Sequence, residues 1–231
     1  KLARPHYNSV VATFCHDIAR NLPIKINDPS VIVSLVYIDD VVESFKRLLL
    51  GDGNKQDCFV EVFPSYNTTV GELAKQLYKF KASRDNLITE PVGKGLVRAL
   101  YSTYVSYLPP ESFSYTVKQY GDERGVFVEM LKTTDSGQFS FFTANPGVTR
   151  GSHYHHSKTE KFLVIKGTAH FRFRHIVTNE THDLAVRGGE ARVVETVPGW
   201  THNITNTGDD ELIVMLWANT IFDPQRPDTI A

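Results

Sequence analysis

The sequence has 231 residues, 41% of them hydrophobic, which suits one large packed domain or two small ones. Its 25 Lys and Arg against 26 Asp and Glu leave a net charge of −1, which argues against a nucleic acid or an anionic membrane surface as a partner. No stretch approaches the roughly 18 apolar residues of a membrane helix. No secretory signal is visible in residues 1–30, and Cys15 and Cys58 match no metal or redox spacing, so we expect a cytoplasmic protein.

The N-terminal part alternates between helical and strand patterns. Apolar residues at helical spacing predict a helix within residues 6–22. Residues 31–38 predict a short buried strand. Asp39 and Asp40 then open a second helix, which Gly51 closes.

The pattern continues with a strand predicted at residues 58–63. Thr68 or Thr69 is expected to cap a third helix, because Glu72 follows three or four residues later, as in an approximate capping box. The first half is therefore predicted to be α/β.

From about residue 113 the pattern changes to short alternating segments separated by turn residues. The six segments are 125–131, 138–144, 161–167, 169–175, 191–197 and 211–218. Strands at this spacing predict a sandwich or barrel. We therefore predict two domains, residues 1–110 and 111–231.

Seven of the nine histidines fall between His153 and His202, in two segments that read GVTRGSHYHHSKTEKFLVIKG and VPGWTHNITN. Side chains on a strand repeat every two residues, so His153 and His155 should share a face. Glu160 and His202 can approach the same point from neighbouring strands. Three imidazoles and one carboxylate suit zinc, iron, nickel or manganese.

Both segments resemble the two sequence motifs of the cupin superfamily, a small β-barrel of jelly-roll type. The agreement covers the glycines of the first motif, the four ligand positions, and the Pro, Gly and Asn of the second. The one departure is that Pro198 and Gly199 are adjacent, which shifts a turn and not the ligands. The resemblance implies that a metal is bound by His153, His155, Glu160 and His202.

The first half resembles the substrate-binding part of extended short-chain reductases that act on nucleotide sugars. The segments that carry this resemblance are RPHYNSVVATFCHDIAR, LVYIDDVV and NTTVGELAKQL. The glycine-rich dinucleotide turn and the Tyr-x3-Lys pair of that family are not found in this first half, residues 1–110, so we expect neither NADPH binding nor hydride transfer here. The resemblances together imply an α/β remnant of a nucleotide-sugar reductase substrate domain, followed by an all-β cupin.

The combination resembles the bifunctional capsular polysaccharide synthesis enzymes of the CapF type over nearly the whole length. LYSTYVSYLP, placed in the linker at 100–109, and FDPQRPDT near the end are further landmarks. In that family one half reduces a 4-keto sugar with NADPH, and a zinc-bearing cupin epimerase inverts C3 of the UDP-4-keto-hexose. The product is UDP-N-acetyl-L-fucosamine for capsule or O-antigen.

The CapF-type resemblance implies Zn²⁺ as the metal, a UDP-4-keto sugar as the substrate and a homodimer formed through the cupin domain. Because the sequence does not begin with Met, we expect a processed N-terminus or a chain truncated at its N-terminus. NADPH would then be used only by a full-length form.

The motifs do not identify the acid/base pair that an epimerase needs. His175, Tyr154 and Lys161 are the candidates, and each has an alternative role as a packing or surface residue. Arg172 and Arg174 share a strand face and could bind the UDP phosphates, with exposed strand arginines as the alternative.

Polar residues near the predicted helix starts are ambiguous in the same way. Arg4 and Asn8 would contact the sugar nucleotide if the first half kept the reductase pocket, and helix capping is the alternative. For Asp39 and Asp40 capping is the favoured role.

Two other functions remain open, because a fold alone does not define a reaction. A set of three His and one Glu also permits an iron-dependent cupin oxygenase, which bound iron and oxygen consumption would reveal. The chain could also be a non-catalytic cupin that binds sugar or dimerises. Solvent deuterium exchange at C3 of the sugar would separate an epimerase from this last alternative.

Overall fold

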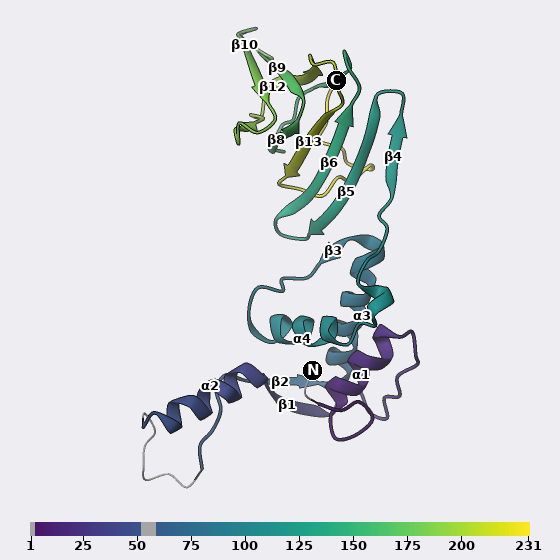
Figure 1. Cartoon of the computed structure of the whole chain (residues 1–231), viewed down its shortest axis with the longest axis vertical. Helices are drawn as coiled ribbons and strands as arrows, with labels where there is room; N and C mark the ends of the chain where they lie inside the picture. The colour runs from purple at the N-terminus through teal and green to yellow at the C-terminus, as the bar shows by residue number, and fades with distance from the viewer. Residues whose placement is uncertain (1–2, 52–58) are drawn as a thin grey trace. The chain divides into compact units, whose positions relative to one another are not determined.

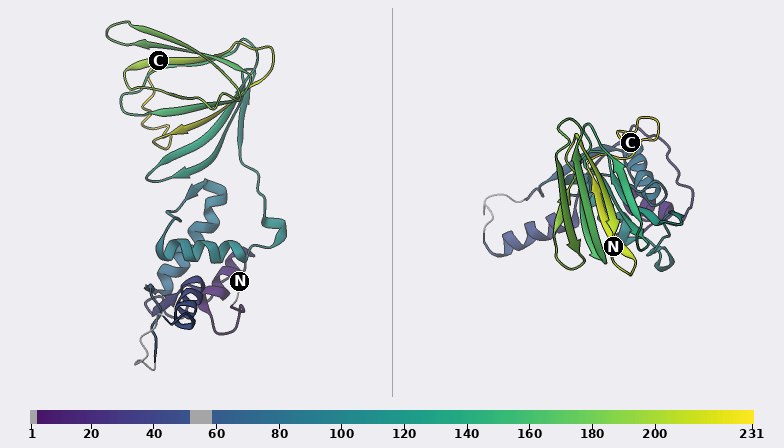
Figure 2. Two further views of the ribbon diagram at one scale, coloured as in Figure 1. Left: turned by 60° about the vertical axis from the view of Figure 1, so that its left-hand side comes forward. Right: turned by 90° about the horizontal axis from the view of Figure 1, so that it is seen from above.

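The computed structural model describes residues 3–51 and 59–231, which fall into two compact units (Figures 1 and 2). The first unit is Lys1–Ser83 with Glu90–Ser114, and the second is Arg84–Thr89 with Tyr115–Ala231. The short strand β3 (Ile88–Thr89) belongs to the second unit because it pairs in parallel with a strand there. No helix in these described ranges is long and apolar enough to cross a membrane.

Helices and a two-stranded sheet make up the first unit. The helices are α1 (Val10–Ala19), α2 (Ile38–Leu49), α3 (Val70–Asn86), α4 (Gly95–Ser106) and the 3-10 helix η1 (Pro110–Ser112). The strands are β1 (Ile32–Val36) and β2 (Ser65–Thr69), which pair antiparallel. One apolar stripe from each of α1, α3 and α4 forms the core, which includes Phe14, Cys15, Ile18, Leu73, Leu77, Phe80, Leu100 and Tyr104.

Hydroxyl side chains fix where α1 and α3 begin. Ser9 Oγ accepts a hydrogen bond from the amide of Ala12 at 3.1 Å. Thr69 Oγ1 accepts one from the amide of Glu72, also at 3.1 Å. These bonds satisfy amides that have no partner within the helix. The predicted helix within residues 6–22 and the predicted cap at Thr69 are confirmed.

The second helix forms where the sequence predicts it, but its start differs. Tyr37 is the N-cap and makes no side-chain cap hydrogen bond. Asp39 and Asp40 lie inside the first turn, where their charge favours the positive end of the helix dipole. None of the α2 residues is buried, and Figure 1 shows the helix projecting from α1, α3 and α4 within the first unit.

The prediction of a strand at 58–63 is wrong, because residues 59–63 form no strand. Cys58 lies outside the described residues. The strand forms instead at β2, where Tyr66 lies opposite Leu35 of β1. An aromatic residue opposite an aliphatic one stabilises a sheet, whereas Pro64 cannot donate to a ladder. β1 itself is not buried as predicted, because a two-stranded sheet leaves one face to solvent.

The segment LYSTYVSYLP is largely helical, which corrects its assignment to a linker. Its first seven residues belong to α4, and Leu100 and Tyr104 are buried in the core of the first unit. Residues four apart lie on one face of a helix, so both side chains reach that core.

The second unit consists of two facing β-sheets, visible in Figure 2. One sheet has the order β10-β9-β12-β7; the other runs β11-β8-β13-β6-β5-β3, with β4 paired to β5. The strands are β4 (Gln119–Asp122), β5 (Gly125–Thr133), β6 (Gly137–Ala144), β7 (Thr149–His153), β8 (Glu160–Lys166), β9 (Thr168–His175), β10 (Thr181–Arg187), β11 (Val193–Glu195), β12 (Trp200–Asn206) and β13 (Leu212–Ala218). All six predicted segments contain strands, and the two-sheet architecture is consistent with the predicted all-β cupin fold.

Alternate residues of these strands face a core between the two sheets. On β12, His202, Ile204 and Asn206 are buried, and the strand partners of His202 and Ile204 on β9 are Phe173 and Phe171. Burying such an apolar side chain contributes about 1.5–3 kcal/mol. The same alternation therefore packs the core and fixes His202 on its inner surface.

Candidate metal centre

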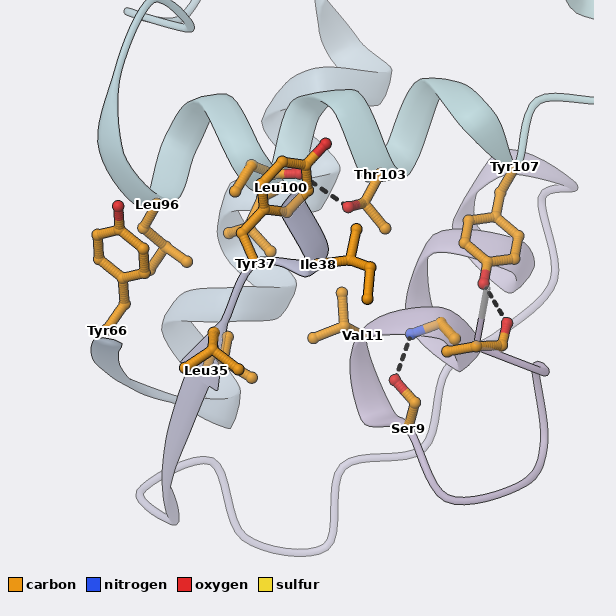
Figure 3. Close-up of a pocket in the computed structure, with 14 residues that line it drawn as sticks. Ser9, Val11, Leu35, Tyr37, Ile38, Tyr66, Leu96, Leu100, Thr103 and Tyr107 are labelled. Carbon is orange, nitrogen blue, oxygen red and sulfur yellow. Dashed lines mark hydrogen bonds between the residues drawn. The ribbon is translucent and has the colours of Figure 1, made fainter. Parts of the chain in front are cut away.

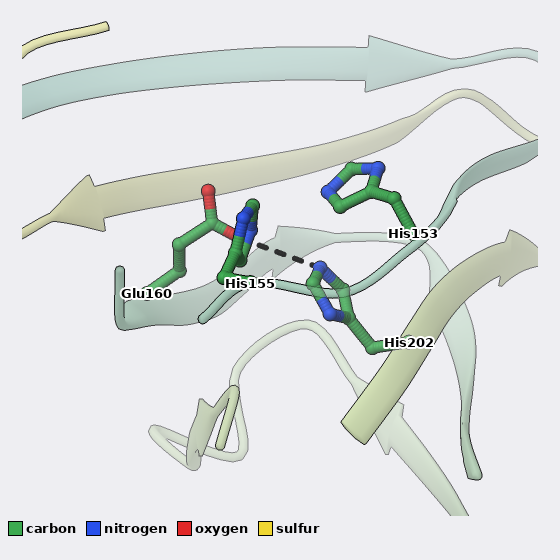
Figure 4. A group of neighbouring side chains, drawn as sticks. All are labelled: His153, His155, Glu160 and His202. Atoms are coloured by element: carbon green, nitrogen blue, oxygen red, sulfur yellow. Dashed lines mark hydrogen bonds and ion pairs between the residues drawn. The ribbon is translucent and has the colours of Figure 1, made fainter. Parts of the chain in front are cut away.

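Four side chains from separate parts of the second unit meet at one point (Figure 4). His153 ends β7, His155 lies in the loop that follows, Glu160 begins β8, and His202 lies on β12. One ligand atom from each lies within 4.8 Å of all the others. The structure thus brings together all four residues that the sequence motifs singled out.

The spacing of these atoms fits a divalent cation. Glu160 Oε2 lies 3.2 Å from His155 Nε2 and 3.3 Å from His202 Nε2. The ring centroid of His153 is 4.9 Å from that of His155 and 4.7 Å from that of His202. Ligands held tetrahedrally at zinc distances are about 3.4 Å apart. Small adjustments of the side chains would therefore complete a coordination shell.

The protonation states also suit a metal. His155, Glu160 and His202 are buried, with 2–4% of each residue exposed. Burial, together with the neighbouring His202 and His155, lowers the pKa of His153 to about 4, so its imidazole is neutral at pH 7. Burial acts to raise the pKa of Glu160, but its neighbours His155, His202 and Lys158 hold it well below its usual range. Neutral imidazoles and an ionised carboxylate are the forms that bind metals.

Lys158 orients the carboxylate of Glu160. Its Nζ lies 3.0 Å from Glu160 Oε1, and only 14% of its side chain is exposed. Oε1 is therefore engaged by the ammonium while Oε2 faces the imidazoles. Lys161, one of the predicted acid/base candidates, directly follows Glu160 on β8, and adjacent strand residues point to opposite faces. Lys161 forms an ion pair with Glu195 and does not line the cavity at the cluster.

The loop between His155 and Glu160 is held by the C-terminal strap, which we define as residues 228–230. The Asp228 carboxylate accepts hydrogen bonds from the amides of His156, Ser157 and Lys158 at 2.8, 2.8 and 2.9 Å. It also accepts one from Ser157 Oγ at 2.9 Å. Hydrogen bonds from the His156 and Ser157 amides lower the pKa of Asp228.

The C-terminal strap also contacts a ligand directly. His155 Nδ1 donates a hydrogen bond to the backbone carbonyl of Asp228, which leaves Nε2 facing the cluster. Tyr154 and Ile230 exchange two backbone hydrogen bonds of 2.9 and 3.0 Å. Partners of this kind fix the tautomer and the ring orientation of a metal-binding histidine. Nothing in the periodic pattern of the sequence pointed to Asp228.

A cavity of about 120 Å³ adjoins the cluster. Its walls include the aromatic side chains of Phe127, Phe142 and Phe162. Arg150 is a further charged residue in its lining, and the sequence motifs did not single it out. A mostly apolar pocket with a few converging polar groups is the usual form of a small-molecule site.

Two of the predicted acid/base candidates lie outside the lining of this cavity. His175 ends β9, where its Nδ1 accepts a hydrogen bond from the Thr178 amide at 3.1 Å and its ring packs on Trp200. Tyr154 pairs with the C-terminal strap and its ring contacts His156.

The two arginines predicted to hold phosphates lie on one face of β9. Arg172 and Arg174 alternate with the buried Phe171 and Phe173, so they face away from the core. Arg172 Nε lies 3.0 Å from Asp183 Oδ1. Both arginines are therefore on the outer surface of their sheet.

The first unit has a cavity of its own, of about 260 Å³ (Figure 3). Its apolar lining includes Leu35 and Leu100, and polar groups such as Ser9 and Thr103 are bound within the unit. Thr103 Oγ1 donates to the Ala99 carbonyl at 2.8 Å, as Figure 3 shows.

The N-terminal residues predicted to contact a sugar nucleotide are not part of this lining. Arg4 and Asn8 are exposed, and neither borders the cavity of the first unit. The adjacent Ser9, not Asn8, caps α1.

Comparison with known proteins gives a consistent picture. Residues 120–230 match the family model of the polysaccharide biosynthesis C-terminal domain. The chain is 60% identical to UDP-2-acetamido-2,6-β-L-arabino-hexul-4-ose reductase of Pseudomonas aeruginosa, an alignment that covers 100% of this chain and 62% of the relative.

Solved structures of capsular polysaccharide assembling protein CapF from Staphylococcus aureus are also similar. They match with a TM-score of 0.94 and 43% identity over 99% of this chain. The match covers 62% of one solved chain and 67% of another. The chain therefore spans about six-tenths of the length of these relatives.

Proposed function

Because this chain belongs to the CapF-type family of polysaccharide biosynthesis proteins, we propose that its second unit is a metal-dependent epimerase. The substrate would be a UDP-4-keto-6-deoxy-N-acetylhexosamine, inverted at C3 on the route to UDP-N-acetyl-L-fucosamine for capsule or O-antigen. The observation that carries the proposal is the buried cluster of three imidazoles and one carboxylate beside a cavity. The 60% identical relative, named for a UDP-linked hexul-4-ose, supports a UDP-4-keto sugar as the substrate.

The proposed reaction needs a stabilised negative charge. A hydrogen on the carbon next to a ketone becomes removable only when the charge left behind is stabilised. A divalent cation held by His153, His155, Glu160 and His202 would supply positive charge beside the ketone oxygen. The phenylalanine walls give the cavity a mostly apolar lining, which strengthens electrostatic interactions inside.

The four cluster residues act as ligands in this proposal and not as the base. A separate acid/base pair must remove the proton and return it to the other face. We propose Zn²⁺ as the metal, because a set of three imidazole nitrogens and one carboxylate oxygen suits it. Pairing of two copies through the second unit stays a prediction, and NADPH-dependent reduction is not proposed for the residues described.

Solvent exchange tests this proposal. Zinc-loaded protein is incubated in D₂O with the UDP-4-keto-6-deoxy-N-acetylhexosamine, without NADPH, and the sugar is analysed by mass spectrometry and NMR. We expect one deuterium at C3 and formation of the C3 epimer. Glu160→Gln and chelator-treated protein should lose the exchange, whereas Arg187→Met, which removes an exposed charge of the same unit, should keep it.

The metal content decides between the proposed function and its alternatives. Zinc bound in a 1:1 ratio without any exchange at C3 would refute the epimerase. Bound iron with consumption of dioxygen would favour an oxygenase instead.

A further inference from the structure

A β-bulge in β7 turns Arg150 toward the interior of the second unit. His153 lies opposite His202 on β12, and Arg150 lies opposite Ile204, with a register shift between the two pairs. His202 and Ile204 are two residues apart and both are buried, so they share the inner face. Their partners, three residues apart on β7, must share it as well, because Ser152 is the extra residue of the bulge.

The backbone conformation at this bulge depends on the glycine at position 151. Gly151 and Ser152 have φ angles of +93° and +67°, in the left-handed region that favours glycine. A Cβ on Gly151 would lie 2.9 Å from the carbonyl oxygen of His202. The close approach of β7 to β12 therefore requires glycine here, and it fixes Arg150 beside the metal cluster.

The guanidinium of Arg150 is held in place but only partly satisfied. Its Nε donates a hydrogen bond to the Thr143 carbonyl at 2.9 Å, and its Cζ lies 5.6 Å from the centroid of the Phe142 ring. Its Nη2 is buried and has no hydrogen-bond partner among the described residues. Burial lowers the pKa of Arg150, although arginine stays charged in proteins.

The carboxylates around Arg150 are already engaged. Asp122, which attracts Arg150 electrostatically, accepts two hydrogen bonds from the side chain of Arg124. Glu160, which lines the same cavity, is engaged by its histidine neighbours and by Lys158. A buried donor on a positive charge that lacks a partner is costly, so such groups are normally satisfied by a ligand or by water.

We propose that Arg150 binds a negatively charged oxygen of the molecule that occupies the metal cavity. Its fixed position beside the cluster is that of a preorganised donor, which stabilises charge without having to reorient. The identity of this oxygen rests on the proposed function. In the epimerase that oxygen would belong to the 4-keto sugar and would gain charge as the proton leaves C3.

Small ligands of different charge test the inference without turnover. The protein is loaded with Co²⁺, and the visible spectrum is followed during titration with acetate, an anion, and with imidazole, a neutral ligand. In Arg150→Met we expect acetate to bind at least tenfold more weakly, while imidazole binding changes less than twofold. Arg150→Lys should recover part of the acetate affinity, and Arg187→Met should match the wild type.

Two results would overturn the inference. One is an acetate affinity that is unchanged in Arg150→Met. The other is an equal loss of acetate and imidazole binding, which would show a merely structural role. Thermal unfolding of each variant verifies that it is folded.

A second measurement separates this inference from the proposed function. In metal-free protein, acetate should shift the Nε–H NMR signal of Arg150 saturably, and no such shift should follow addition of acetamide. A chain that fails to bind metal but shows this shift would refute the metal-dependent epimerase and keep the anion site. A chain that binds metal but lacks the shift would remove only the role of Arg150.

Discussion

Replacing Asp228 should weaken metal binding although this residue does not belong to the ligand cluster. Its carboxylate accepts four hydrogen bonds from residues 156–158, the loop between two ligands. Its carbonyl accepts the Nδ1–H of His155. Without the carboxylate, the C-terminal strap loses its main attachment to that loop, so the Asp228 carbonyl is no longer held firmly against His155 and the orientation of this ring loosens.

The size of the effect follows from these bonds. Hydrogen bonds to charged groups contribute about 1.5–3 kcal/mol each when buried. Asp228 is only half-buried, so we take about 2–4 kcal/mol for the four together. Loss of a partner that orients a metal ligand lowers metal affinity by about 10–100-fold. We expect a loss in this range for Asp228→Ala and a smaller one for Asp228→Asn, which keeps one acceptor oxygen.

Competition for zinc against a chromophoric chelator measures this loss. Asp223→Asn is the matched control, because Asp223 lies in the same tail but accepts its hydrogen bond from the Gln225 amide and not from the loop at 156–158. Equal zinc affinities for wild type and Asp228→Ala would refute the role of the C-terminal strap. So would an equal loss in Asp223→Asn.

In metal-free protein, the effect of Asp228→Asn on the free energy of unfolding should depend on pH. Hydrogen bonds from the His156 and Ser157 amides hold the pKa of Asp228 below its ordinary value of about 3.9. A lowered pKa contributes stability that is fully present above the ordinary value and is lost as the pH falls through the lowered one. The stability difference between wild type and Asp228→Asn should therefore be constant from about pH 8 to 5 and shrink below about pH 4. Denaturant unfolding monitors it, and a difference that grows in acid would contradict this assignment.

Four further predictions concern metal, core, helix cap and thiol. Zinc at 100 times its Kd should stabilise the second unit by about 2.7 kcal/mol, seen as a rise in Tm that a chelator reverses; an unchanged Tm would contradict metal binding to the folded unit. Phe171→Ala should cost about 3–5 kcal/mol in denaturant unfolding, because the side chain is fully buried between the sheets. Thr69→Ala should cost about 1 kcal/mol in the same measurement, and Thr69→Ser much less. In a Cys58→Ser background, Cys15 should resist thiol reagents at pH 8 until the protein unfolds, because burial raises its pKa to about 12; rapid labelling of folded protein would count against this.

Much of the second unit could be predicted because its strands alternate strictly. The segment at 211–218 is a clear case, since every second residue from Leu212 to Ala218 is buried. β10 was missed because it is an edge strand that begins with exposed polar residues and has little apolar alternation. In the first unit, the apolar run at 58–63 outweighed the more polar β2, whose strand pairing depends on β1.

The metal cluster could be predicted because its spacing is local to two short segments. Its surroundings could not. Asp228 lies 73 residues from His155 along the chain, in a tail without periodic pattern. Lys161, a predicted acid/base candidate, directly follows Glu160 on β8 and forms an ion pair with Glu195, whereas Lys158, which the sequence motifs did not single out, reaches the Glu160 carboxylate. Arg150 was missed because simple alternation places it on the opposite face from His153.

The extra residue in β7 makes the interior of the second unit depend on chain length as well as on residue identity. Among relatives of this chain, one with a single deletion between Arg150 and His153 would still carry every histidine and the glutamate. Its arginine, however, would be rotated to the solvent side, and its cavity would lose a positive charge. Motif matching would score both chains alike, so counting the residues between this arginine and the first histidine gives a simple way to sort such sequences by the ligands they can hold.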